Sequence, residues 1–147
     1  MSDDATARPR GITGPVPLGR PGWSMLASGA DTNASFELYE ERRDTAGGPP
    51  PHVHREHEEL FYVLEGRYVF IRDREEIELA PGGSIVVPRG TRHHFRTLVE
   101  PSRTLILIVP AGLEGFFRGM GDELAAGRTA LEAMTTLSRR YDSHPVD

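Results

Sequence analysis

The feature that most constrains this chain is a run of short apolar or alternating segments between Trp23 and Pro110, separated by glycine- and proline-rich breaks. Alternation of apolar and polar residues is typical of β-strands, and glycine or proline at the breaks is typical of turns. Segments that recur about every 8 to 12 residues predict an antiparallel sandwich or barrel. The predicted strands are Trp23 to Ala27, Ala34 to Arg43, Glu59 to Leu64, Arg67 to Arg72, Glu75 to Leu79, Ser84 to Val87, His93 to Leu98 and Arg103 to Val109.

The pattern changes after Pro110, where apolar residues recur at helical spacing. Two short helices are predicted, over Gly115 to Leu124 and over Ala130 to Tyr141, and we expect their apolar faces to cover an open side of the barrel. The residues of the first face that could also form a lid over a pocket are Phe116, Phe117 and Met120. The sequence therefore predicts a flexible N-terminal arm over 1–22, a β-barrel over 23–110 and a helical extension over 111–147.

The stretch from Pro49 to Gly66 contains the residues that point most directly to chemistry. His52 and His54 are two apart, so an extended strand would direct both imidazoles to one face. Glu59 begins the next apolar run, and a hairpin would bring its carboxylate alongside them. His93 follows a later turn and offers a third imidazole. Three imidazoles and one carboxylate, in a chain without cysteine, predict the ligand set of a divalent transition metal.

The neighbouring titratable residues are expected to lie outside the ligand set. Glu58 should face away from the site, but a register shift of one residue would make it the ligand instead of Glu59. His94 should point to the face opposite His93. His57 lies in the expected bend, either exposed or supporting the ligands, and His144 lies in a polar tail and is predicted to take no part.

Composition excludes several classes of function. The chain has 147 residues and a formal net charge of −5, which indicates one domain without the clustered basic residues that nucleic-acid binding requires. The polar start does not resemble a signal peptide, and no apolar run is long enough to span a membrane. We therefore expect a soluble, cytoplasmic protein that acts on a small molecule.

Two apolar sets have expected roles. One set should face the barrel interior and form an apolar substrate pocket that accepts aromatic groups, and comprises Phe36, Leu38, Phe61, Val63, Phe70 and Phe95. The other set should form a second apolar face that needs a cover, and comprises Leu60, Tyr62, Leu64, Leu105, Leu107 and Val109. A symmetric homodimer through this second face is the simplest cover.

The spacing of the histidines resembles that in the motifs of the small single-domain cupins, most closely their flavonol (quercetin) 2,3-dioxygenase-like branch. The first cupin motif has its counterpart in His52-x-His54, Glu59 and Gly66. The second has its counterpart in Gly82, Pro88-x-Gly90 and His93. Two departures are that Gly47 lies one residue closer to His52 than usual and that Thr97 stands where the family often has asparagine.

The resemblance implies an all-β fold, a double-stranded β-helix (cupin or jelly-roll barrel), here with two short C-terminal helices. It also implies one divalent transition metal held by His52, His54, Glu59 and His93. Iron or manganese is expected first, with nickel, copper, cobalt and zinc as alternatives.

A metal-dependent dioxygenase or oxygenase acting on a small enolisable or phenolic molecule, flavonol- or polyketide-like, is the leading functional hypothesis. In similar cupins a glutamate at the position of Glu59 removes the substrate proton before ring cleavage by dioxygen, so Glu59 is the candidate catalytic residue. One alternative is a non-redox isomerase, cyclase or hydrolase that uses the metal as a Lewis acid. Another is a cupin that binds a small molecule without turnover, although the residues before Trp23 are too few for the DNA-binding domain of a regulator.

Overall fold

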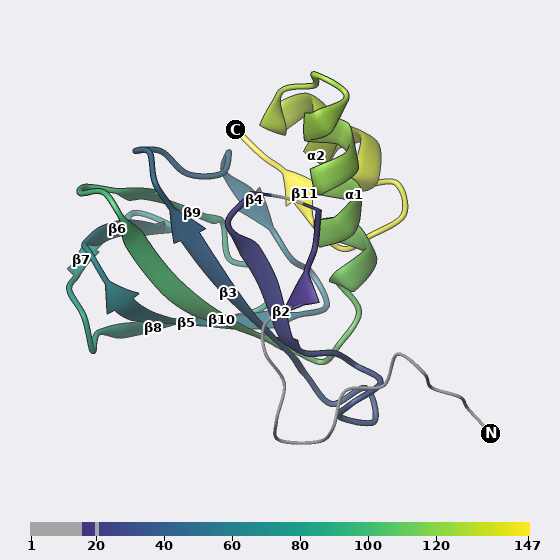
Figure 1. The fold of residues 1–147 in the computed structure, drawn as a ribbon, viewed down its shortest axis with the longest axis horizontal. Coiled ribbons are helices and arrows are strands. Elements are labelled where there is room, and N and C mark those ends of the chain that lie inside the picture. The colour runs from purple at the N-terminus through teal and green to yellow at the C-terminus, as the bar shows by residue number, and fades with distance from the viewer. Residues whose placement is uncertain (1–15, 20) are drawn as a thin grey trace.

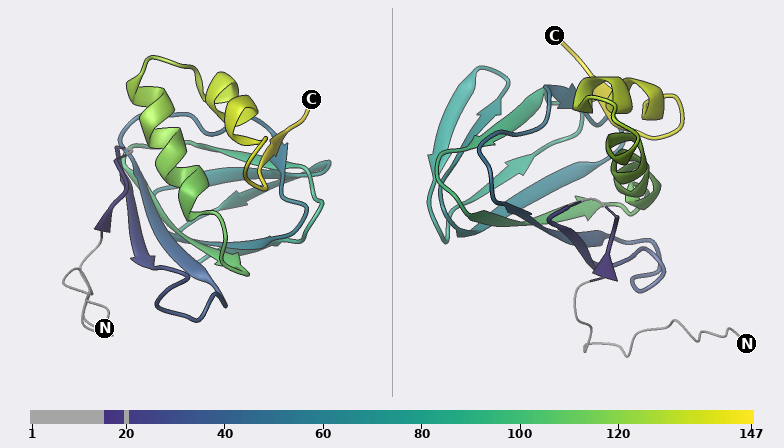
Figure 2. Two further views of the ribbon diagram at one scale, coloured as in Figure 1. Left: turned by 90° about the vertical axis from the view of Figure 1, so that its right-hand side faces the viewer. Right: turned by 45° about the horizontal axis from the view of Figure 1, so that its top comes forward.

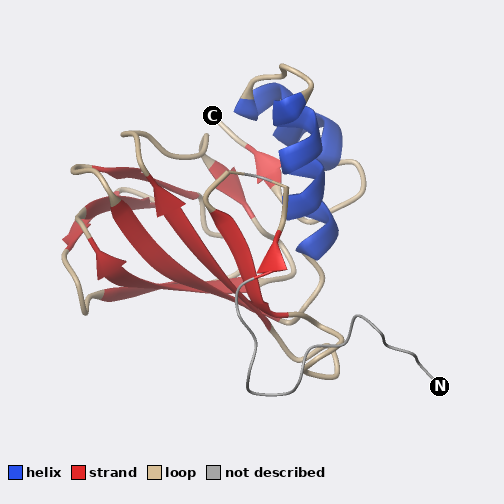
Figure 3. Ribbon diagram, viewed as in Figure 1, coloured by secondary structure: helices blue, strands red, loops and turns tan. Residues whose placement is uncertain are grey.

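The computed structural model describes residues 16–19 and 21–147, which form a barrel of two antiparallel sheets with two helices at one side (Figures 1 and 3). Within these residues one sheet is six-stranded, in the order β1-β2-β3-β10-β5-β8, and the other is five-stranded, in the order β11-β4-β9-β6-β7. The strands are β1 (Val16–Pro17), β2 (Trp23–Ala27), β3 (Glu37–Arg43), β4 (His52–Val53), β5 (Glu58–Glu65), β6 (Tyr68–Arg72), β7 (Glu75–Leu79), β8 (Ser84–Val87), β9 (His93–Thr97), β10 (Ser102–Val109) and β11 (His144–Pro145). The predicted antiparallel two-layered architecture is confirmed.

The core lies between the two sheets and follows from strict alternation along the central strands. On β5, Phe61 and Val63 are buried while Tyr62 between them is 41% exposed. Strand β10 pairs with β3 on one side and β5 on the other, and its residues Ile106 and Ile108 add to the same inner face. Aromatic side chains of the opposing sheet complete this layer, namely Tyr68, Phe70 and Phe95.

The turn between β5 and β6 depends on Gly66. Its φ of 83° lies in the left-handed region that favours glycine, and a Cβ at this position would come within 2.0 Å of Ser102 Oγ. Both constraints explain why the chain turns at this residue. The hairpin that the sequence suggests at Gly66 is wrong, however, because β5 and β6 lie in different sheets and the turn carries the chain from one sheet to the other.

Strand β3 has the opposite face inward from the one that the sequence predicted. Glu37, Tyr39 and Glu41 are buried, whereas Phe36 and Leu38 are only half-buried. The placement of Phe36 and Leu38 inside the barrel is therefore wrong. The alternation predicts the strand correctly but not which face lies inward. Apolar residues usually face the core, but a buried carboxylate is tolerated when hydrogen-bond donors surround it.

Those donors for Glu37 come from the start of α1 (Glu114–Ala125). The Glu37 carboxylate accepts hydrogen bonds from the backbone N–H groups of Gly112, Leu113 and Glu114 at 3.0, 3.1 and 3.3 Å. It thereby caps a helix whose own N-cap residue, Leu113, has no side chain that can do so. A buried acidic residue of β3 thus fixes the position of α1 on the barrel.

Helices α1 and α2 (Ala130–Leu137) cover the open side of the barrel (Figure 2). On α1, Phe116, Phe117 and Met120 are buried, and Phe117 stacks on Trp23 of β2 with ring centroids 4.6 Å apart. Helix α2 begins with a capping box between Thr129 and Glu132. It ends at Leu137, earlier than the predicted Tyr141, and the chain then returns to the barrel edge.

The returning segment forms β11, which the sequence did not predict. His144 and Pro145 pair with Val53 and His52 of β4, and Val146 N–H donates to Pro51 O at 3.0 Å. The last residues of the chain therefore add a strand beside the histidine pair (Figure 1).

Most of the predicted N-terminal arm lies outside the described residues. Its described part includes β1, which pairs with β2, and Leu18, which is 3% exposed. In the part of the chain that the structure describes, no helix is both long and apolar enough to cross a membrane.

Candidate metal centre

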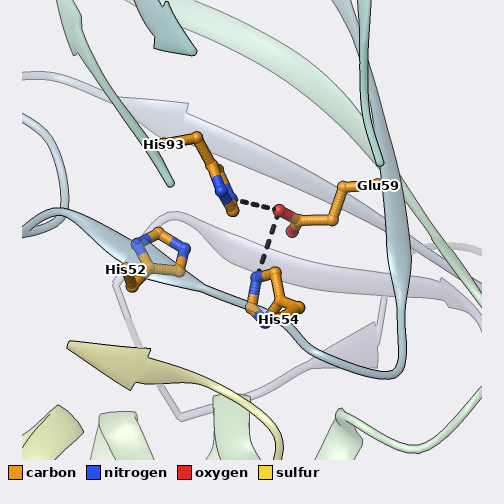
Figure 4. A group of neighbouring side chains, drawn as sticks. All are labelled: His52, His54, Glu59 and His93. Atoms are coloured by element: carbon orange, nitrogen blue, oxygen red, sulfur yellow. Dashed lines mark hydrogen bonds and ion pairs between the residues drawn. The ribbon is translucent and has the colours of Figure 1, made fainter. Parts of the chain in front are cut away.

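Three strands and one connecting segment bring His52, His54, Glu59 and His93 together inside the barrel (Figure 4). His52 on β4 is paired directly with His93 at the start of β9. His54 follows β4, and Glu59 is the second residue of β5 in the opposite sheet. All four side chains are buried, and one ligand atom from each lies within 4.8 Å of the others.

Backbone carbonyls hold each imidazole in one orientation. The Nδ1 atoms of His52, His54 and His93 lie 2.8, 2.7 and 2.9 Å from the carbonyl oxygens of Pro50, Asp142 and Thr91. Because a carbonyl oxygen only accepts, each Nδ1 must carry the proton. The lone pair of a neutral ring is then on Nε2, the atom left for the centre, as in metal-binding histidines whose second nitrogen donates to an outer partner.

The Nε2 atoms of two of these rings converge on Glu59. His93 Nε2 and His54 Nε2 lie 2.7 and 3.2 Å from Glu59 Oε1, and His54 Nε2 is buried without a well-formed hydrogen bond to any described residue. Two lone pairs and a carboxylate oxygen this close repel one another unless a proton or a cation lies between them. Ligand atoms on opposite sides of one ion would be about 4 Å apart, so these donors fit a single divalent metal.

Two groups of the centre, Glu59 and His52, have the charge state that a cation requires. Burial alone would raise the pKa of Glu59, but the neighbouring His54 and His93 hold that pKa well below its ordinary value. Burial, reinforced by His93 and His54, lowers the pKa of His52 well below its ordinary value. For His54, burial is outweighed by the Glu59 carboxylate, and the pKa is raised. Glu59 is thus ionised and His52 neutral at neutral pH, as metal binding demands.

Asp142, from the segment after α2, supports the centre at several points. Its carbonyl oxygen accepts from His54 Nδ1, and its carboxylate accepts from the backbone N–H groups of Arg55 and Glu56 at 2.8 and 2.6 Å. The same carboxylate lies 2.7 Å from His57 Nδ1. One residue therefore fixes a ligand ring and the bend between the first ligands and Glu59. Nothing in its polar sequence context indicated this role.

A cavity of about 240 Å³ opens beside the centre and lies under the helices. His52, His54 and Glu59 line one part of it. Apolar side chains from both sheets and both helices form most of the remaining wall, namely Trp23, Phe61, Phe95, Ile106, Phe116, Phe117, Met120, Leu124 and Met134. Such an apolar cavity with a few convergent polar groups is typical of a small-molecule site.

The predicted pocket residues separate into two groups. Phe61 and Phe95 line the cavity. Val63 and Phe70 are buried in the core behind it. Leu38 lies on the outer face of β3, and Phe36 is half-buried just before that strand. The predicted set was too wide because it assigned every inward aromatic or aliphatic residue to the pocket, whereas the middle of the barrel is filled by its own side chains. The helical residues Phe116, Phe117 and Met120 line the cavity as well as packing on the core.

The other titratable residues of the stretch lie outside the centre. Glu58 forms an ion pair with Arg89 at the surface. His94 is on the alternate face of β9 from His93. His57 is buried against Asp142, and His144 Nε2 lies 3.1 Å from the same carboxylate, so both belong to the support around Asp142.

A family model described as a cupin domain matches residues 41–110, which span β4 to β10 and all four centre residues. The chain is also 32% identical over 98 residues to the quercetin 2,3-dioxygenase of Bacillus subtilis. This chain contains a cupin domain. The predicted all-β double-stranded β-helix with two short C-terminal helices is confirmed. The alignment to the Bacillus enzyme covers 67% of this chain but 29% of that protein, so this cupin matches less than a third of its length.

Solved structures resemble the domain at lower identity. The structure of KdgF from Halomonas sp. has a TM-score of 0.55 and 25% identity, covering 62% of this chain and 81% of that one. A chain from the structures of the DMSP lyases RdDddP and RnDddQII has a TM-score of 0.54 and 29% identity, covering 62% of this chain and 48% of that one. The proteins similar to this chain therefore include a dioxygenase and a DMSP lyase.

Proposed function

We propose that this cupin is a metal-dependent oxygenase acting on a small enolisable or phenolic molecule of flavonol or polyketide type. The observation that carries the proposal is the convergence of three oriented imidazoles and the Glu59 carboxylate on one wall of an apolar cavity. The similarity to the Bacillus quercetin 2,3-dioxygenase supports oxygen chemistry. A cytoplasmic location stays a prediction of the sequence.

His52, His54, Glu59 and His93 would hold the ion, with iron or manganese expected before nickel, copper, cobalt or zinc. A redox-active ion would supply Lewis acidity toward adjacent substrate oxygens and a route for electrons to dioxygen. Glu59 would take the acidic proton of the substrate, since one of its oxygens is free to accept while the other faces the histidines. Phe61 and Phe95 would hold the aromatic ring and exclude water from the charged oxygen.

Metal content measured by elemental mass spectrometry on the wild type and on His54→Ala tests the centre. We expect near-stoichiometric iron, manganese, nickel or copper in the wild type and at least a tenfold lower content in the variant, because a lost ligand weakens chelation by about this factor or more. Oxygen uptake with flavonol should then depend on the metal. Glu59→Gln should abolish uptake even in protein fully loaded by added metal; full activity in that variant would show that Glu59 is not the base.

A non-redox use of the same centre is the second candidate, and the similarity to the DMSP lyase structures favours it. In that case Glu59 would still move a proton, but the reaction would need no dioxygen. Turnover under argon at the aerobic rate, with zinc as the native metal, would replace the oxygenase proposal by this one.

We also propose that two copies pair through the outer face of the six-stranded sheet. Tyr62, Val86 and Val109 are 41%, 46% and 37% exposed there, around half-buried leucines of β5 and β10. Light scattering should give twice the monomer mass for the wild type and the monomer mass for Tyr62→Glu. A wild-type monomer would overturn this part of the proposal.

A further inference from the structure

The cavity has a second polar end, which the proposed function does not use. Glu41 and Arg43 alternate with outward-facing residues on β3, and both line the same cavity as the metal centre. Glu41 is 1% exposed. Its Oε2 accepts from Trp23 Nε1 at 2.8 Å and lies 2.9 Å from Arg43 Nη2. An ion pair this deeply buried is expensive in desolvation free energy unless all of its polar atoms have partners.

Several polar atoms here lack such partners. Glu41 Oε1, Arg43 Nε and the Tyr68 hydroxyl are buried and make no hydrogen bond to any described residue. Burial, followed by the nearby Glu41 carboxylate, raises the pKa of Tyr68, so its hydroxyl stays protonated beside the pair. Buried polar atoms are almost always paired, so the unpaired atoms of Glu41 and Arg43, which line the cavity, indicate a partner bound there.

Strand register separates this pair from the metal centre. Successive inward residues of β5 are Glu59, Phe61 and Val63, and Glu41 is level with Val63 across β10. The two polar ends are therefore two inward positions apart along the sheet. Phe61 and Phe95 line the cavity between them, and the guanidinium carbon of Arg43 lies 5.3 Å from the centre of the Phe95 ring. An aromatic molecule would fit between the two ends with a polar group at each.

We propose that Glu41 and Arg43 bind a neutral hydroxyl group at the far end of an aromatic substrate whose chelating oxygens face the metal centre. A hydroxyl can donate to Glu41 Oε1 and accept from Arg43 Nε at the same time. A carboxylate in this place would meet the Glu41 charge, and a bare ring would leave both atoms unpaired. The inference deepens the proposed function, and it rests on that function for the placement of the chelating end.

Three probes that share one chelating oxygen pair test the subsite: flavonol, its 4′-hydroxy derivative and its 4′-carboxylate. Binding to zinc-loaded protein under argon, where an oxygenase cannot turn over, is followed by quenching of Trp23, the only tryptophan of the chain and part of the cavity wall. Wild-type protein should bind the hydroxy derivative about tenfold or more tightly than flavonol, and the carboxylate more weakly than flavonol.

Glu41→Gln should reduce the preference for the hydroxy derivative over flavonol to about twofold or less, because the charged acceptor for the hydroxyl proton is lost. Arg43→Met should also lose the preference for the hydroxy derivative, because it removes the donor to the hydroxyl oxygen. With two variants, the test still gives an answer if circular dichroism shows that one of them is poorly folded. Glu40→Gln is the matched control: Glu40 is the neighbouring acid, faces outward and pairs with Arg103, so the preference should persist.

Trp23, Glu41 and Arg43 also border an outer hollow of about 210 Å³. If the unpaired atoms only bind water from this hollow, Glu41→Gln will leave the relative affinities of the probes unchanged, and the inference fails. It also fails if none of the three probes binds. His54→Ala separates it from the proposed function. That variant should weaken all probes equally; unchanged affinities in His54→Ala with a lost preference in Glu41→Gln would refute chelation and leave the hydroxyl subsite standing.

Discussion

At the scale of single residues, Asp142 couples the end of the chain to the metal centre. Its carboxylate accepts from two backbone N–H groups and from His57, and its carbonyl oxygen orients His54. We expect Asp142→Asn to lower the free energy of unfolding by about 1–3 kcal/mol, because an amide nitrogen would face donors that now meet a charged acceptor. Metal affinity should fall about tenfold, since the orientation of a ligand ring is disturbed. Urea unfolding and metal titration measure the two effects.

Asp44→Asn serves as the matched control, because Asp44 is exposed and pairs only at the surface with Arg42. Its unfolding free energy should stay within about 0.5 kcal/mol of the wild type. Equal losses in both variants would show that the Asp142 network contributes nothing specific.

The same residue gives the stability a pH dependence of known sign. Burial opposes ionisation of Asp142, but hydrogen bonds from His57 and from the backbone of Arg55 and Glu56 lower its pKa below the ordinary 3.8. A lowered folded-state pKa contributes stability that is fully present above the unfolded value and is lost as the pH falls through the folded value. The difference in unfolding free energy between wild type and Asp142→Asn should therefore be constant from pH 7 to about 5 and shrink below about 4. A difference that grows on acidification would contradict this assignment.

Local spacing could predict the four centre residues but not the residues that support them. His52 and His54 share a strand face, and Glu59 and His93 follow at motif spacing, so a pattern within the sequence was enough. Asp142 contacts Arg55 and His57, which lie more than 80 residues earlier in the chain. No local period encodes such a contact.

At the scale of elements, α1 is attached to the barrel by a charge rather than by its apolar face alone. The Glu37 carboxylate is 2% exposed and accepts from three backbone N–H groups at the helix start. Glu37→Gln should lower the free energy of unfolding by about 1–3 kcal/mol, because the helix end loses its anion and one of its acceptors. Thermal unfolding measures this loss. Trp23 fluorescence should change as well, since Trp23 stacks on Phe117 of the displaced helix.

Glu114→Gln isolates the effect of the cap from that of charge near the helix start. Glu114 lies in the first turn and forms an exposed ion pair with Arg118, so its neutralisation should cost less than about 1 kcal/mol and leave the fluorescence unchanged. A fluorescence change as large as that of Glu37→Gln would mean that the buried cap does not hold the helix.

Strand β3 shows where prediction of an element fails. Its alternation was clear, yet the acids Glu37 and Glu41 face inward and Leu38 faces outward. The phase is decided by α1 and by Trp23, which supply donors for the two carboxylates from distant parts of the chain. Hydrophobicity predicts which face of a strand is buried only when no such hydrogen-bond partner exists. Here the face that was predicted to point outward includes Glu41 and Arg43, which line the cavity.

At the scale of the whole molecule, the metal centre would connect the two sheets. Glu59 belongs to the six-stranded sheet, whereas His52 and His93 belong to the five-stranded one. In the part of the chain that the structure describes, β4 is a strand of two residues held by β9 and β11. Because β4 makes few strand hydrogen bonds, a bound ion with ligands from both sheets would stabilise the contact between the sheets at this end of the barrel.

Removal of the metal by a chelator should lower the melting temperature by several degrees, because an ion that binds only the folded state adds RT ln(1 + [M]/Kd), about 4 kcal/mol at a thousandfold excess over Kd. Hydrogen exchange should locate the loss. Protection should fall in residues 50–59 and 141–146, which surround the ligands and β11, while β6 and β7 at the other end of the barrel keep theirs. His54→Ala, which lacks a ligand, should show this exchange pattern before chelation and no further change after it. A uniform loss of protection in both sheets would instead mean that the ion stabilises the barrel as one cooperative unit.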